Sequence, residues 1–404
     1  RPRQSAMAGG EGSAEDAALR RTRALCERRG RPGRISDEGL AALAVHKYQA
    51  GPITPVDRVL YCLWWEPLAK RLPLWLAPNA LTVAGSAAAI SSGLLLWACA
   101  PDLEQEVPCW AELLAFALTI LYQTCDALDG MQARRTGAAS PLGGLLDHGS
   151  DCLCLTSFTL GYCASQRLGF GPATFFSLVV SWLPWWLAQW EAYHTGVVRT
   201  GGELFGITEI ELVVASIHLI SALAGPGVWE MLIPLPGLPG GGAELRHVCT
   251  CIQITVATVL SALNFRNGLD WARAHGAAAA AVRRLRPMAV LTAVTLVWPV
   301  TMPGLHPRLL CTCVSALYSR LASELVLCHM THEEYPSPLP ALWVLPVFYI
   351  LGVLGLLSGA MGTAAMLAYT AWCVGAACLY LHDVVEEVAT HLGVLVLRIG
   401  KRED

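Results

Sequence analysis

Four aspartates that fall within 26 consecutive residues are the side chains of this sequence best suited to chemistry. They are Asp126, Asp129, Asp147 and Asp151. The first two are three residues apart and the last two are four apart, so each pair lies on one face of a helix. Gly137 and Pro141, between the pairs, predict a turn that lets the two helices run antiparallel. All four carboxylates are therefore expected to converge.

Carboxylates gathered in apolar surroundings need cations. Each one close to hydrocarbon costs about 2.5–3.5 kcal/mol, and like charges nearby raise that cost. Pairing with Arg134, Arg135 or lysines at a headgroup boundary is the simplest compensation, but four acids at helical spacing favour a metal site. Mg²⁺, Ca²⁺ and Mn²⁺ prefer carboxylate oxygens, and no cluster of His and Cys competes for softer metals. Two such ions hold a pyrophosphate and stabilise the attacking and the leaving oxygen of a displacement.

Small and basic residues in the same segment suit a phosphate ligand. Gly130 and Gly143 let the backbone approach a ligand closely. The planar guanidinium of Arg134, or as an alternative that of Arg135, binds phosphate oxygens in pairs. Together with the aspartates, these residues predict metal-dependent phosphoryl transfer.

Membrane helices are the elements that must position these residues. Of 404 residues, 54% are hydrophobic and only 15% charged, whereas a soluble domain carries about a quarter charged residues. The net charge of −3 gives no indication of nucleic-acid binding. Because about 20 apolar residues span a bilayer, we predict an all-α polytopic membrane helix bundle with about ten transmembrane helices. These are expected at 81–100, 108–126, 147–166, 172–194, 208–228, 246–265, 287–304, 308–329, 338–358 and 363–386.

Charge is distributed unevenly between the predicted loops. Basic residues gather around Arg134, at Arg199 and in 266–286, whereas the loop 101–108 on the opposite side is acidic. This asymmetry satisfies the positive-inside rule if both termini and the aspartates are cytosolic. The expected divisions are a mobile basic N-terminal tail (1–52), an interfacial amphipathic helix (53–76), a catalytic core (77–265), additional transmembrane helices that serve the acceptor or a dimer contact (266–392) and a cytosolic C-terminal tail (393–404).

The aspartate segment resembles the signature of the CDP-alcohol phosphotransferase family, D-x2-D-G-x2-A-R-x8-G-x3-D-x3-D. Its fixed positions are Asp126, Asp129, Gly130, Ala133, Arg134, Gly143, Asp147 and Asp151. Further motifs, the length and the ten-span layout are similar to the eukaryotic choline and ethanolamine phosphotransferases. These motifs are HKY at 46–48, WLAPNALT at 75–82, QARRT at 132–136, SPL at 140–142, DHG at 147–149, TEI at 208–210 and HMT at 329–331.

The resemblance implies a CDP-choline or CDP-ethanolamine donor, a diacylglycerol acceptor, two Mg²⁺ or Mn²⁺ ions, and CMP and a phospholipid as products. It implies that Asp126, Asp129 and Asp147 are metal ligands. Asp151 would bind the second ion and is one candidate for the general base, with His148 as the other. The residues implied to line the CDP pocket are Asn79, Gly130, Ala133, Arg134 and Gly143. Location in the endoplasmic reticulum or Golgi and a homodimer are further expectations from the family.

Two positions depart from the pattern of the choline and ethanolamine branch. Met131 stands where that branch has lysine, and Gly144 stands where it has glutamate. A carboxylate four residues before His148 would orient the imidazole and raise its basicity. Gly144 cannot do so, which weakens the case for His148 as the base or requires a water or another acid to substitute for the glutamate. These departures also leave a catalytically silent, lipid-binding relative as an alternative class, besides a cation transporter with intramembrane acids.

A stripe of aromatic residues bears on the choice of headgroup. Trp186, Trp190 and Tyr193 share one helix face, with Glu191 beside them. Aromatic faces bind quaternary ammonium groups, so the stripe is a candidate cage for choline. Helix packing or an interfacial aromatic belt explains the same pattern.

Overall fold

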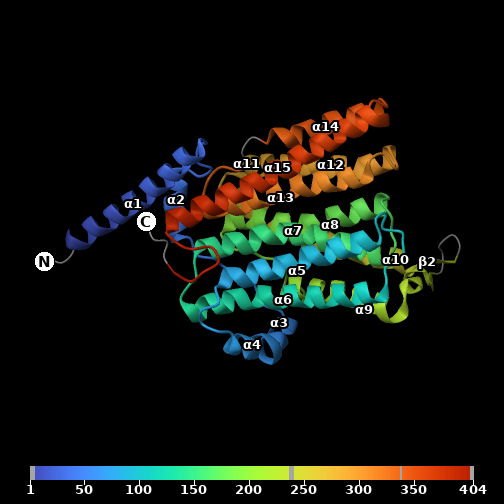
Figure 1. The fold of residues 1–404 in the computed structure, drawn as a ribbon, viewed down its shortest axis with the longest axis horizontal. Coiled ribbons are helices and arrows are strands. Elements are labelled where there is room, and N and C mark those ends of the chain that lie inside the picture. The colour runs from blue at the N-terminus through green and yellow to red at the C-terminus, as the bar shows by residue number, and fades with distance from the viewer. Residues whose placement is uncertain (1–4, 236–240, 337–338, 401–404) are drawn as a thin grey trace.

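The computed structural model describes residues 5–235, 241–336 and 339–400. Long helices run side by side along the molecule (Figure 1). Each of the ten predicted apolar segments overlaps one helix. These helices are α5 (Pro78–Cys99), α6 (Cys109–Thr136), α7 (Pro141–Ser165), α8 (Pro172–Thr195), α9 (Ile207–Ala224), α10 (Leu245–Ala274), α12 (Arg286–Thr301), α13 (Pro307–Thr331), α14 (Pro340–Val353) and α15 (Gly359–Leu392).

Among the described residues, six helices are both long and apolar enough to cross a membrane, namely α5, α6, α9, α10, α13 and α15. Helices α12 and α14 are short, with 16 and 14 residues. Helices α7 and α8 have 25 and 24 residues, but neither is among these six. The all-α multi-pass class is confirmed, and the number of spans stays a prediction. Position 338 of the ninth predicted span, and 401–404 of the predicted C-terminal tail, lie outside the described residues.

Helix α13 forms the centre of the bundle, because it packs against α7, α8, α12 and α15. Helix α5 packs against both α6 and α7. The α5–α7 contact requires glycine at position 93, since a Cβ there would lie 2.7 Å from the carbonyl oxygen of Ser157. The core boundary predicted at 265 falls inside α10, a continuous helix that packs on α8.

The antiparallel hairpin of α6 and α7 is confirmed. Helix α6 ends at Gly137, which has the left-handed φ of 66° that glycine adopts without strain. Ser140 caps α7 by accepting a hydrogen bond from the Gly143 amide, and Pro141 occupies the first turn. The turn therefore brings the end of α6 and the start of α7 to the same end of the bundle, which is on the left in Figure 1.

The N-terminal segment differs from the unstructured tail that its composition predicts. It contains α1 (Ser5–Arg29), which packs against α15, and α2 (Asp37–Val45), which packs against α13. Three arginines converge on one carboxylate: Arg29, Arg31 and Arg34 lie 3.0–3.5 Å from Asp383 of α15. The Asp383 side chain is 4% exposed. The arginines and this acidic partner are far apart in the sequence, with Arg31 and Asp383 separated by 352 positions, so basic composition alone suggested a free tail.

The segment predicted to be an interfacial helix is helical and lies across the end of α6 (Figure 1). It consists of α3 (Pro55–Leu60), the π-helical turn η1 (Tyr61–Trp65) and α4 (Glu66–Arg71). Leu63 and Trp75 are 74% and 77% exposed. Exposed apolar side chains of this kind suit the headgroup layer. The remaining elements are α11 (Ala278–Arg283), the 3₁₀ turn η2 (Pro226–Glu230) and an antiparallel hairpin of β1 (Leu232–Pro234) and β2 (Gly242–Glu244).

Candidate active site

Three of the four aspartates form a compact carboxylate cluster. Asp126 of α6 and Asp147 and Asp151 of α7 each place an oxygen within 4.8 Å of the others. Asp126 and Asp147 come from different helices, so the cluster spans the α6–α7 hairpin. A divalent cation held between these carboxylates would compensate their negative charge. The donor set consists of carboxylate oxygens, which fits a hard ion such as Mg²⁺ or Mn²⁺.

Asp129 lies beside the cluster and faces α5. One of its oxygens accepts a hydrogen bond from the Thr82 hydroxyl, and the residue is 8% exposed. Tyr122 acts in a similar way on the other side, because its hydroxyl donates to Asp151 at 2.7 Å. Thr82 and Tyr122 were not singled out from the sequence. Tyr122 lies four residues before Asp126 on α6, a spacing that could have indicated it, whereas Thr82 comes from α5 and has no such signal.

The two arginines of the segment have different surroundings. Arg135 donates to the carbonyl oxygens of Ala69 and Leu72, so it attaches α4 to the end of α6. Arg134 lies along the face of Gly130, where a Cβ would be 3.5 Å from its guanidinium. The alternative that Arg135 binds phosphate is therefore disfavoured, and Arg134 is the arginine on the side of the aspartates.

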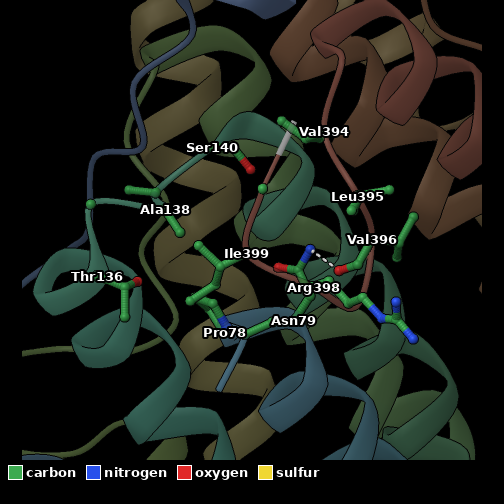
Figure 2. Close-up of a pocket in the computed structure, with 14 residues that line it drawn as sticks. Pro78, Asn79, Thr136, Ala138, Ser140, Val394, Leu395, Val396, Arg398 and Ile399 are labelled. Carbon is green, nitrogen blue, oxygen red and sulfur yellow. Dashed lines mark hydrogen bonds between the residues drawn. The ribbon is translucent and has the colours of Figure 1, made fainter. Parts of the chain in front are cut away.

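Asn79 lies where the C-terminal segment crosses the end of the α6–α7 hairpin. Its side-chain amide donates to the Val396 carbonyl at 2.9 Å, and its carbonyl oxygen would be 3.4 Å from a Cβ at Gly143. Figure 2 shows this contact at the wall of a cavity of about 230 Å³. The cavity is lined by the start of α5, the turn 136–140 and the segment 394–400. The resemblance thus selected two residues, Asn79 and Gly143, that the fold places together.

His148 is buried between α7 and α8. Its Nε2 lies 3.7 Å from an Asp147 oxygen, and its Nδ1 lies 3.1 Å from the Gln189 amide nitrogen. Gln189 is fully buried, and its oxygen has no hydrogen-bond partner among the described residues. Gln189 was missed from the sequence, although it lies within the aromatic stretch of α8.

Two aromatic rings flank His148. Trp185 lies at 5.6 Å and Tyr48, the third residue of the HKY motif, at 5.0 Å between ring centroids. Tyr48 is 53% exposed, yet desolvation of its hydroxyl and then the charges of Asp147 and Asp151 raise its pKa. The hydroxyl therefore stays protonated at neutral pH and is available as a hydrogen-bond donor.

The aromatic stripe does not form a cage. Trp186 and Trp190 are 1% and 0% exposed, and Trp190 stacks on Phe265 at 5.8 Å between ring centroids. The Tyr193 hydroxyl donates to the Glu333 carbonyl. Helix packing therefore uses this face, and the choline-cage hypothesis for it is wrong. Trp185, one position before the stripe, is the aromatic residue of α8 that contacts His148.

The sequence is similar to those of several known proteins. Residues 75–226 match the model of the CDP-alcohol phosphatidyltransferase family. The chain is 35% identical to cholinephosphotransferase 1 of Gallus gallus over 236 residues, which are 58% of this chain and 68% of that protein. It is 28% identical to choline/ethanolaminephosphotransferase 1 of Arabidopsis thaliana over 398 residues, 92% of this chain and 100% of that protein. A match to cholinephosphotransferase 1 of Xenopus laevis reaches 36% identity but spans only 50% of that protein. The chain belongs to the CDP-alcohol phosphatidyltransferase family, which confirms the resemblance of its aspartate segment.

Proposed function

We propose that this protein transfers phosphocholine or phosphoethanolamine from a CDP-alcohol to diacylglycerol and releases CMP. The observation that carries the proposal is the convergence of Asp126, Asp147 and Asp151 at the same end of the hairpin as Asn79 and Arg134. In that arrangement, carboxylates that can bind metal ions lie next to residues that can bind a nucleotide. Relatives that are named for choline and for ethanolamine support both donors, and choline is the first choice.

In the reaction, the diacylglycerol hydroxyl attacks the phosphorus that bears the headgroup, and the bond from that phosphorus to the CMP oxygen breaks. Two Mg²⁺ or Mn²⁺ ions, when bound by Asp126, Asp129, Asp147 and Asp151, would stabilise charge on the attacking and leaving oxygens. Arg134 would bind a phosphate oxygen of the donor. The nucleotide pocket would be lined by Asn79, Gly130, Ala133 and Gly143. When the nucleotide binds, the Asn79 amide would donate its hydrogen bond to the ligand and no longer to the Val396 carbonyl.

We assign the hydroxyl proton to His148 rather than to Asp151. Asp151 is engaged by the Tyr122 hydroxyl and by the carboxylate cluster. Rotation of the Gln189 amide by half a turn would bring its unpartnered oxygen onto the Nδ1–H of His148, which leaves Nε2 free to accept a proton. Gln189 would thereby take over the orienting task of the glutamate that Gly144 replaces.

The site would face the cytosol, where water-soluble CDP-alcohols are available, and both termini would lie on that side. The acceptor would enter laterally from the bilayer, because its acyl chains do not cross water cheaply. Location in the endoplasmic reticulum or Golgi and a homodimeric state are part of the same proposal.

A transfer assay tests the function. The full-length protein purified in detergent is given diacylglycerol, Mg²⁺ or Mn²⁺, and labelled CDP-choline or CDP-ethanolamine. We expect labelled phosphatidylcholine, phosphatidylethanolamine or both, and no product when the cation is chelated. If neither donor yields a phospholipid, the proposal is wrong. Binding of a CDP-alcohol without turnover would instead identify a silent, lipid-binding relative.

Restoring the family glutamate at position 144 should increase turnover. A Cβ at Gly144 would meet no atom within 4 Å, so the added side chain has space. Four residues before His148 on α7, its carboxylate would raise the basicity of the imidazole, and we expect Gly144→Glu to raise kcat by up to about tenfold. Gly144→Gln is the control for size without charge. An unchanged kcat in Gly144→Glu would favour Asp151 or water as the base.

A further inference from the structure

Glu211 is a fifth acid at the edge of the carboxylate cluster, outside the family signature. It lies on the buried face of α9, which packs against α6 and α7, and the residue is 7% exposed. Val214, on the next turn of α9, packs against the group that contains Tyr122. Because the Tyr122 hydroxyl binds Asp151, this packing places Glu211 beside the reacting end of the hairpin.

Within the described part of the chain, the charged groups around Glu211 are acids. The charged groups that act on its carboxylate are Asp126, Asp151 and Asp57. Among the described residues, the Glu211 side chain has no hydrogen bond or ion pair. A carboxylate that is more than nine-tenths buried in acidic surroundings is costly unless a cation reaches it.

Glu211 lies outside the group of carboxylates that would hold the metal ions. Asp126, Asp147 and Asp151 bring their oxygens within 4.8 Å of one another, and Glu211 is not part of that group. Two divalent ions carry a charge of about +4, which the four aspartates of the signature already balance. Arg134 lies next to Gly130 and acts on Asp129, and it is not among the charged groups that act on Glu211. A positively charged group of the ligand is therefore the partner that can balance the negative charge of Glu211.

We propose that Glu211 binds the ammonium group of the CDP-alcohol donor and so selects a cationic over a neutral headgroup. This inference rests on the proposed function, in which both donors carry an ammonium next to the phosphate that is transferred. It assigns recognition of the headgroup to α9, in place of the aromatic stripe of α8. Glu211 acts here as a specificity residue, since it touches the headgroup and takes no part in bond breaking.

The test compares ligands that share phosphates but differ in the headgroup. For wild type, Glu211→Gln and Glu211→Asp, one measures the KM of CDP-choline and CDP-ethanolamine, the inhibition constants of CDP and of CDP-glycerol, and the Mg²⁺ concentration for half activation. Loss of one charge pair should raise both donor KM values about tenfold in Glu211→Gln. The inhibition constants of CDP and CDP-glycerol should change less than about twofold. Glu211→Asp should retain part of the affinity for the donors. Glu203→Gln, an exposed acid in the preceding loop, is the matched control.

Each outcome distinguishes between the two proposals. Wild-type protein that converts neither donor contradicts the proposed function itself. Active wild type with unchanged donor KM in Glu211→Gln contradicts only the headgroup role. The inference is overturned if Glu211→Gln needs more Mg²⁺ for half activation and loses affinity for CDP as much as for the donors. That result would identify Glu211 as a metal ligand. Unchanged inhibition by CDP shows that the variant is folded.

Discussion

Replacing Asp147 by asparagine is expected to reduce phospholipid synthesis by at least about a thousandfold, the loss that follows when several kcal/mol of charge stabilisation by metal ions is removed. Asparagine has nearly the same shape as aspartate, so the change removes charge and not volume. Asp147 places an oxygen within 4.8 Å of oxygens of both Asp126 and Asp151. Its neutralisation therefore removes one of the three charges of the carboxylate cluster.

Labelled phospholipid formed per minute at saturating donor is the measurement for Asp147→Asn. The matched control is Asp270→Asn, an exposed acid on α10 that pairs with Arg266 and Arg273 away from the cluster. A second readout, independent of turnover, is the shift in melting temperature on addition of Mg²⁺, which should be smaller in Asp147→Asn than in wild type. Retention of more than about a tenth of the activity would exclude Asp147 as a metal ligand.

His148→Ala is expected to lower kcat by about 10²–10⁴-fold, the usual contribution of a positioned general base. The KM for the CDP-alcohol should change little, because the proposed base acts on the acceptor. Gln189→Leu removes only the orienting contact with Nδ1, so its loss of kcat should be smaller and of the same kind.

The assay for this pair is kcat and KM at saturating diacylglycerol. His382→Ala serves as control, because this histidine of α15 is 67% exposed and far in sequence from the site. If His148→Ala keeps the wild-type kcat, the proton passes to Asp151 or water. If Gln189→Leu lowers kcat as far as His148→Ala does and also raises KM, the contact between Gln189 and His148 stabilises the fold and does not orient the base.

Local spacing in the sequence determined the elements of the site. Aspartates three and four residues apart must share a helix face, and glycine at 137 with proline at 141 must interrupt the helix between them. Continuous apolar stretches determined the long helices in the same way, since every backbone group there has to be satisfied within its own helix. These properties depend on neighbours in the chain, which is why the all-α class and the hairpin were predicted correctly.

The tertiary structure alone decided what each face of a helix contacts. Sequence gives Arg134 and Arg135 the same chemistry, and only the position of α4 assigns Arg135 to its carbonyl groups. In the same way, packing of α8 against α10 buries Trp190 and leaves Trp185 next to His148. The physical reason is that adjacent helical positions differ by about 100° in direction. A periodic pattern fixes which residues share a face, but the relative rotation of distant helices fixes what that face touches.

The same distinction applies to the four aspartates of the site. The sequence determined the four signature aspartates and their chemistry, because the residue types and spacings are local. Partners that come from helices outside the hairpin, namely Thr82, Gln189 and Glu211, were identified only in the packed bundle. No spacing rule relates α9 or α8 to the hairpin, since those contacts arise from burial of whole helix faces and not from the order of residues.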